Sequence, residues 1–257
     1  MNEMMKEIEY GRVFADGEVA ALYQYRAPYP SGVFAILERL VVGPRIVLDA
    51  GTGTGALARR LPRSIERIDA VDPSAAMIAR GRALPGGDDP RIRWIVGRAE
   101  TAPLSPPYGL ITVGASLHWM QTEVVLPRFR DSLAPGARLA IVDTETTHSG
   151  AWRTEMLDII RRYSPLEHHL ETHEMVLHAV QRGVLALEGE ERTSPEPFDQ
   201  SADDYLRLLG STSTLSRVTL GPRAIEFDAE CRELFARHRM SRIRSTVVGY
   251  VAWSTLT

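Results

Sequence analysis

Three glycines at alternate positions follow an aspartate at the end of a short apolar run. The acid is Asp49, and the glycines are Gly51, Gly53 and Gly55. Glycines at this spacing let the backbone turn sharply and approach a ligand closely, as in loops that bind nucleotide-type cofactors. We therefore predict a cofactor loop here, followed by a helix over residues 55–61 that presents its unpaired N–H groups to the ligand.

The glycines alone do not identify the cofactor, because Gly51, Gly53 and Ala56 also fit the pattern G-x-G-x-x-[GA] of dinucleotide sites. Asp49 favours a different ligand. Beside a diphosphate, at roughly 4 Å and an effective dielectric of about 20, its carboxylate would add about 4 kcal/mol of repulsion. The same carboxylate attracts the ammonium group of S-adenosylmethionine, a cofactor that carries no phosphate.

A second acid, Asp72, closes the next apolar run, which spans residues 68–71. An acid at the end of the second strand of such a fold can accept hydrogen bonds from both ribose hydroxyls of a cofactor. Asp72 can instead, or in addition, cap the helix that starts near Ser74. In the ribose role it adds to the case for S-adenosylmethionine.

These segments, taken in order, resemble the class I S-adenosylmethionine-dependent methyltransferases. The similarity covers about residues 20–145 and rests on residues 49–55, 71–74, 97–104, 110–119 and 133–136. Within that family, Tyr25-Arg26, Tyr29-Pro30 and His118-Trp119 are most similar to the branch that contains trans-aconitate methyltransferase and many small-molecule enzymes. The resemblance implies an α/β fold, a Rossmann-like doubly wound sheet of seven mostly parallel strands, with a helical insertion between strands five and six.

The resemblance also implies a cofactor site for S-adenosyl-L-methionine, which leaves as S-adenosyl-L-homocysteine. In relatives, an arginine near position 26 often reaches the cofactor's carboxylate. The expected cofactor-binding residues are Arg26, Asp49, Ala50, Gly51, Thr52, Gly53, Asp72, Pro73, Met77, Arg98, Ala99, Glu100, Gly114, Ala115, Ser116 and Trp119.

His118 is the candidate catalytic residue, because an imidazole just beyond the fourth strand can remove a proton from the methyl acceptor near neutral pH. It can equally be a residue that only packs in the loop, and an acceptor that is already ionised needs no base. The expected substrate-binding residues are Tyr25, Tyr29, Trp152 and His169. A carboxylate acceptor would require converging arginines, for which Arg153, Arg161 and Arg162 are the candidates.

Short β-branched runs alternate with helical patterns in the first part of the chain, which predicts parallel strands joined by crossover helices. The expected strands span residues 45–49, 67–71, 92–96, 110–114, 138–142, 184–193 and 247–253. The expected helices, besides 55–61, span residues 74–84, 123–133, 152–163, 171–182, 202–209 and 223–238. We expect a single domain over residues 1–257, with residues 145–183 as a lid-like insertion and residues 193–200 as a connection.

Composition excludes several classes of function. A net charge of −3 over 257 residues gives no general attraction to nucleic acid. One cysteine, Cys231, rules out an internal disulfide and suits a reducing compartment. His168, His169 and His173 lack a metal-binding frame, so we expect no metal. The first ten residues do not resemble a signal peptide, and no run is long and apolar enough for a membrane span, so we expect a cytoplasmic protein.

The sequence predicts a methyltransferase that acts on a small molecule, such as an organic acid or a compound of secondary metabolism. It leaves open whether oxygen, nitrogen or carbon accepts the methyl group, and whether the chain is a monomer or a homodimer. An alternative is a protein of the same fold that binds S-adenosylmethionine and organises a non-methylating rearrangement, or acts as a binding module.

Overall fold

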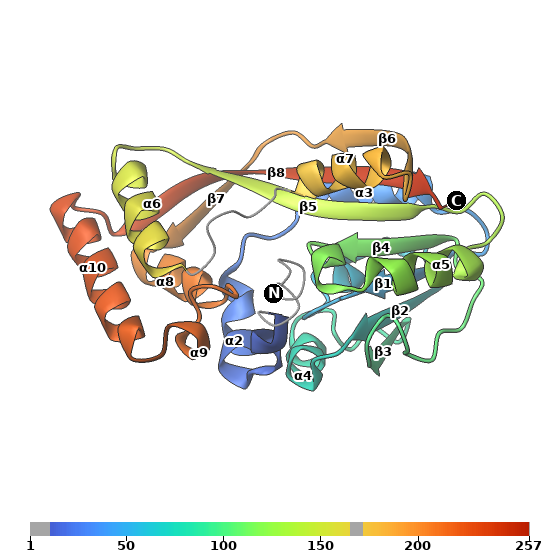
Figure 1. Ribbon diagram of the computed structural model, residues 1–257, viewed down its shortest axis with the longest axis horizontal. Coiled ribbons are helices and arrows are strands. Elements are labelled where there is room, and N and C mark those ends of the chain that lie inside the picture. Colours follow the sequence, from blue (N-terminus) through green and yellow to red (C-terminus); the bar gives the residue numbers. More distant parts are fainter. Residues whose placement is uncertain (1–10, 165–171, 257) are drawn as a thin grey trace.

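Five parallel strands form one side of a mixed sheet in the computed structural model, which describes residues 11–164 and 172–256. Their spatial order is β3-β2-β1-β4-β5 (Figure 1). Because parallel strands end at the same edge of a sheet, the residues that close β1, β2 and β4 lie side by side. The strands are β1 (Ile46–Ala50), β2 (Arg67–Asp72), β3 (Ile92–Val96), β4 (Leu110–Gly114) and β5 (Leu139–His148).

Three further strands complete the sheet. β8 (Arg242–Thr255) runs antiparallel to β5, with residue pairs from Leu139 and Ser254 to His148 and Ser245. On the other edge of β8, β6 pairs with its second half and β7 with its first half. The Rossmann-like fold is therefore confirmed, with eight strands where seven were predicted. The two shorter strands are β6 (Ala186–Arg192) and β7 (Glu196–Ser201).

The extra strand, β7, replaces the connection that was predicted over residues 193–200. That prediction was wrong because Pro195 and Pro197 suggested a loop. A proline removes a donor from a strand ladder and is tolerated where the strand lies at an edge. β7 is such a strand, since it pairs only with β8 among the described strands.

Helices cover both faces of the sheet and enclose two apolar clusters. Alternate residues of β1 face opposite sides, so Val47 packs with α3 (Ser31–Leu40) and Leu48 packs on the side of α5 (Thr122–Ser132). α7 (Thr172–Gln181) joins the α5 side through the buried side chain of Val176. All three side chains are at most 2% exposed, which fixes the sheet between two helical layers.

A separate helical unit lies beyond the ends of the long strands β5 and β8 (Figure 1). Its apolar core joins helices from two regions of the chain and includes Trp152, Tyr205, Phe227 and Cys231. We call this unit the cap; its helices are α6 (Trp152–Tyr163), α8 (Ala202–Gly210), α9 (Arg217–Leu220) and α10 (Ala224–Arg237).

The cap divides the segment 145–183 that was expected to form one insertion. Residues 145–148 continue β5, α6 belongs to the cap, and α7 packs on the sheet instead. Most cap helices come from the region between β7 and β8.

Short helices at the start of the described chain close the space between the sheet and the cap. They are η1 (Gly11–Ala15), α2 (Gly17–Leu22) and η2 (Tyr23–Tyr25). Asp16 caps α2 by accepting a hydrogen bond from the Glu18 N–H at 2.7 Å. Val19 of α2 then packs against Met77 of α4 (Ala75–Ala83).

The helix predicted over residues 55–61 is absent from the structure. The chain instead makes turns and the single 3-10 turn η3 (Ala58–Arg60). Gly55 has a left-handed φ of +74°, and Leu61 is extended because it precedes Pro62. Both ends of the segment therefore leave the helical conformation, and no helix begins at the end of the loop.

The other helices in the described ranges are short. α10 has 14 residues and α6 has 12. A membrane span needs about 20 predominantly apolar residues. In residues 11–164 and 172–256, no helix has the length and apolar character to cross a membrane.

Candidate active site

A cavity of about 770 Å³ lies where the carboxyl ends of the parallel strands meet the cap. Its lining includes the loop after β1, the end of β2, the exits of β3 and β4, the extension of β5, and α8. A single small-ligand pocket typically has about 300–1,000 Å³. Ligands of this fold class bind at that edge of the sheet, so this cavity is the candidate active site.

The glycine loop after β1 forms one wall of the cavity. Gly51 and Gly53 have φ values of +67° and +56°, in the left-handed region that favours glycine. A Cβ on Gly51 would lie 2.5 Å from the Cβ of Ser116, so this glycine packs against the protein. A Cβ on Gly53 would meet only the Tyr23 ring, at 3.7 Å. The backbone at Gly53 is therefore the open part of the loop.

Asp49 is held inside the base of this loop. Its carboxylate accepts hydrogen bonds from the hydroxyl of Thr52 and, at 2.8 Å, from that of Thr112. Burial raises the pKa of Asp49 to about 6, while these two hydroxyl groups act in the opposite direction. Asp49 thus fixes the loop to β4, and it also borders the cavity.

Asp72 holds the same loop from β2. Its Oδ2 accepts a hydrogen bond from the Gly53 N–H at 2.8 Å, and its Oδ1 accepts one from the Ser74 N–H at 2.8 Å. Ser74 is the N-cap of α4, because its Oγ accepts from the Met77 N–H. Burial raises the pKa of Asp72, and the two backbone donors oppose that effect.

The exit of β4 forms the wall opposite Asp72. Ala115 has a φ of +47°, which is uncommon for a residue with a side chain and marks local strain. The conformation is held by the Ala115 N–H, which donates to the Val142 carbonyl at 2.9 Å, and by Ser116, whose hydroxyl donates to the Ala50 carbonyl at 2.9 Å. Strained residues of this kind concentrate at functional sites.

Arg26 connects the glycine loop with the cap. Its guanidinium stacks on the Tyr23 ring, 4.0 Å from the centroid, and Tyr23 is the neighbour of Gly53. The same guanidinium donates to the hydroxyl of Ser211 at 2.9 Å and to its carbonyl at 2.8 Å. Arg26 therefore stands between the two halves of the cavity.

The structure brings most of the sequence-predicted cofactor residues to this cavity. Of the sixteen, fifteen line it; Ala50 is the exception, because it is fully buried in the sheet. Glu100 is placed by accepting from the Gln121 N–H at 2.9 Å, and it pairs with Arg98 at 3.1 Å. These contacts position the residues at the exit of β3.

The predicted catalytic and substrate residues are more scattered. Tyr29 lines the cavity, whereas His118 and Tyr25 are not among its lining residues. His118 packs against Trp119 with ring centroids 4.3 Å apart. Trp152 is a core residue of the cap, and its indole N–H donates to the Ser149 carbonyl. His169 lies outside the described residues.

The arginines expected for a carboxylate acceptor do not converge on the cavity. Arg161 pairs with Asp158 on the exposed side of α6, and Arg162 pairs with Glu230 of α10. Arg153 is exposed and is not a lining residue.

Sequence reasoning missed the acceptor half of the cavity. Asp143, Thr144, Thr146 and His148 of β5 line it together with Tyr205 of α8. Thr144, Thr146 and His148 alternate along the strand and so share one face. That alternation is the only sequence signal for this wall, because β5 was predicted to end at residue 142.

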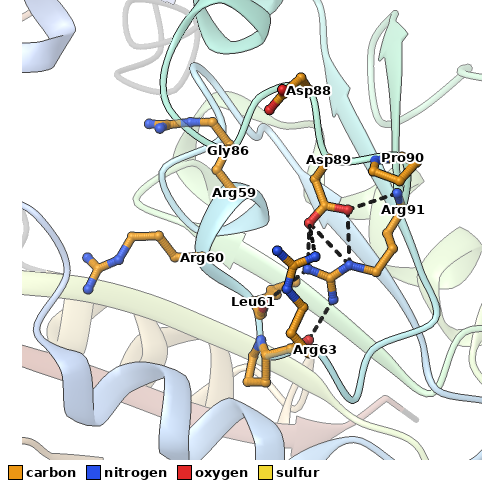
Figure 2. Close-up of a pocket in the computed structure, with 10 residues that line it drawn as sticks. Arg59, Arg60, Leu61, Arg63, Gly86, Asp88, Asp89, Pro90 and Arg91 are labelled. Carbon is orange, nitrogen blue, oxygen red and sulfur yellow. Dashed lines mark hydrogen bonds and ion pairs between the residues drawn. The ribbon is translucent and has the colours of Figure 1, made fainter.

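A second, more open hollow is lined by residues 59–63 and by residues of the segment that leads into β3 (Figure 2). Asp89 is its centre: Arg91 donates to it at 2.7 Å and Arg63 at 3.3 Å. Arg91 also donates to the carbonyls of Pro62 and Ile65. The hydrogen bonds from Arg91 lower the pKa of Asp89 to about 2. This cluster fastens η3 to the start of β3, and its charges are already satisfied.

Within the described ranges, no three His, Cys, Asp or Glu side chains are grouped in a way that could hold a metal ion.

The glycine loop, the buried acids on β1 and β2, and the cavity at the carboxyl edge together define a Rossmann-like domain of the class I methyltransferase fold. Residues 47–136 match the family described as "Methyltransferase domain". This part of the chain therefore matches a methyltransferase domain.

Similar proteins agree with this classification. The chain is 33% identical over 123 residues to an uncharacterized methyltransferase of Mycobacterium tuberculosis, covering 46% of this chain and 61% of the relative. It is 32% identical over 123 residues to acetylserotonin O-methyltransferase of Mus musculus, covering 44% of this chain and 32% of that enzyme. The chain thus spans less than two thirds of the length of these relatives.

Among solved structures, a provisionally assigned type II methyltransferase from Anaeromyxobacter dehalogenans is similar over 89% of this chain and 96% of its own. The TM-score is 0.63 and the sequence identity is 24%. At this identity the similarity establishes the fold.

Proposed function

We propose that this protein is an S-adenosylmethionine-dependent methyltransferase with a small-molecule acceptor. The observation that carries the proposal is Gly53, whose open backbone faces the cavity while Asp72 accepts its N–H. This arrangement places a bare peptide and a buried carboxylate on one wall. A ribose and an amino-acid moiety fit these groups, whereas a diphosphate would meet two acids.

The cofactor, when bound, supplies an activated methyl group on a sulfonium. The residues of the chain then have to bind and align the two reactants, because positioning provides most of the acceleration of an in-line displacement. Asp72 would hold the ribose, Arg26 would meet the carboxylate of the cofactor, and Asp49 would add negative potential near its ammonium. We assign no proton acceptor, because His118 does not line the cavity.

Three observations support a small acceptor. The cap lines one end of the cavity, whose volume of about 770 Å³ suits one or two small ligands. The net charge of −3 gives no attraction to nucleic acid. One relative is named for a small acceptor, acetylserotonin.

Calorimetric titration with S-adenosylmethionine, S-adenosylhomocysteine and NAD tests the proposal. Asp72→Ala would remove hydrogen bonds to a charged group that are each worth about 1.5–3 kcal/mol, so we expect S-adenosylhomocysteine to bind at least about 100-fold more weakly. Asp88→Asn is the control, because it removes a negative charge on the exposed surface of the second hollow. Binding of NAD without S-adenosylhomocysteine would contradict the proposal.

Product analysis separates methyl transfer from the alternative functions. A methyltransferase releases S-adenosylhomocysteine in equal amount to a methylated acceptor. A protein that binds the cofactor and organises another rearrangement would convert its substrate without releasing S-adenosylhomocysteine.

A further inference from the structure

The cap end of the cavity carries two polar side chains whose hydrogen-bonding capacity is not used up within the protein. Tyr205 of α8 and His148 at the end of β5 both line the cavity, and their rings meet edge to face with centroids 5.3 Å apart. They come from segments 57 positions apart (205 minus 148), so the fold and not local sequence brings them together.

Tyr205 is 4% exposed and packs in the apolar core of the cap. Its hydroxyl makes no hydrogen bond to any residue in the part of the chain that the structure describes, yet its oxygen is not among the fully enclosed unpartnered atoms. A buried hydroxyl without a partner destabilises the folded state by at least as much as one hydrogen bond stabilises it. A hydroxyl kept in this position therefore indicates a partner that arrives through the cavity.

His148 is held in place by the neighbouring strand. Its Nδ1 lies 2.8 Å from the hydroxyl of Ser245, its register partner on β8. The contact with Ser245 leaves Nε2 as the ring nitrogen for a ligand. Burial, followed by the charge of Arg153, lowers the pKa of His148, and burial raises the pKa of Tyr205. Both groups are therefore uncharged near neutral pH.

We propose that Tyr205 and His148 form a neutral recognition pair that binds an uncharged polar group, such as a hydroxyl, carbonyl or amide, at the far end of an elongated methyl acceptor. This inference rests on the proposed function and defines its substrate class. Asp143 lies on β5 near the carboxyl edge of the parallel strands, where the glycine loop is. At about 3.3 Å per residue, His148 stands roughly 16 Å farther along β5. The acceptor must therefore reach from the cofactor side to the cap.

The surroundings of the pair disfavour a carboxylate at this position. Arg153, whose charge acts on His148, is exposed outside the lining, where solvent screens it. Of the four lining arginines, Arg26 is assigned above to the carboxylate of the cofactor, and those at positions 59, 60 and 98 donate to groups of the protein. A carboxylate at the cap would therefore be buried without a counter-ion, which is far more costly than burying an amide that finds both hydrogen bonds.

A pair of probes of equal shape tests the inference. Protein saturated with S-adenosylhomocysteine is titrated with 4-(4-hydroxyphenyl)butanamide and with 4-(4-hydroxyphenyl)butanoate. They differ only in the distal group, which is an uncharged amide that donates and accepts hydrogen bonds or a charged carboxylate that only accepts them. We expect the amide to bind at least about tenfold more tightly. Tyr205→Phe should weaken amide binding about fivefold, as for one neutral hydrogen bond. Ser245→Ala should also weaken amide binding, because the imidazole of His148 would lose the hydrogen bond that holds it.

Tyr163→Phe is the matched control. Its hydroxyl belongs to the cap, donates to Glu230 at 2.7 Å and does not line the cavity, so amide binding should not change. Equal binding of the two probes, no binding of the amide, or an unchanged affinity in Tyr205→Phe would overturn the inference. A failure of S-adenosylhomocysteine to bind in the first step would instead contradict the proposed function.

Discussion

Gly51 and Gly53 share a backbone conformation but have different neighbours, so replacing each by alanine separates stability from binding. Both variants place a Cβ in the left-handed region, at a cost of roughly 1–2 kcal/mol. At Gly51 the new Cβ would lie 2.5 Å from Ser116, whose hydroxyl is tied to the Ala50 carbonyl. Overpacking of this kind adds about 1–3 kcal/mol. At Gly53 the space is open.

The expected loss of stability is therefore about 2–5 kcal/mol for Gly51→Ala and about 1–2 kcal/mol for Gly53→Ala. In a chain of this size, 1 kcal/mol corresponds to roughly 2–4 °C in Tm. Gly136→Ala is the control for backbone strain. Gly136 has a φ of +76°, has no atom within 4 Å of its would-be Cβ, and lies in the turn before β5.

Thermal unfolding with and without S-adenosylhomocysteine measures both effects. A ligand at 100 times its Kd stabilises the folded state by about 2.7 kcal/mol. A methyl group on Gly53 would stand on the cofactor wall, and a tenfold loss of affinity would reduce this gain to about 1.4 kcal/mol at the same ligand concentration. Gly136→Ala should keep the full gain. If Gly53→Ala binds as the wild type does, or is less stable than Gly51→Ala, the assignment of the loop wall is refuted.

Two further predictions concern single side chains. The pKa of Asp49 is raised by burial from 3.8 to about 6, so its folded form binds protons more tightly and its contribution to stability is lost as pH rises from about 4 to 6. Between about pH 4 and 6, Asp49→Asn should therefore lose roughly 3 kcal/mol less unfolding free energy than the wild type. Denaturant unfolding at both pH values measures this, and an equal loss in the two proteins would exclude it. His118 does not line the cavity, so His118→Asn should keep kcat within about threefold, measured by release of S-adenosylhomocysteine with an acceptor found by screening; a loss of about 10²–10⁴ would establish it as the general base.

The cofactor half of the site could be predicted from sequence because its signals are local. A strand that ends in Asp49, the glycines after it, and Asp72 after the next strand are all readable within a few residues. The predicted helix over residues 55–61 failed because the left-handed Gly55 and the proline after Leu61 remove both of its ends. Here local backbone constraints overrode the helix that the glycine pattern had predicted.

The acceptor half could not be predicted for a different reason. The β5 extension is polar and partly exposed, so its Thr144–His148 segment lacks the apolar character of the earlier strands. It is a strand because β8 pairs with it along its whole length. The contact between His148 and Tyr205 depends on that pairing and on a cap assembled from distant helices, which no local pattern shows.

The division of the cap between two regions of the chain limits how acceptor preference could be altered by exchanging parts with a relative. α6 comes from the β5–β6 connection, whereas α8, α9 and α10 precede β8. A graft of α6 alone would leave the apolar surface around Trp152 and Phe227 without its partner. A functional exchange would have to carry both regions and the outer ends of β5 and β8 as one piece, while the cofactor wall around Gly53 and Asp72 could stay unchanged.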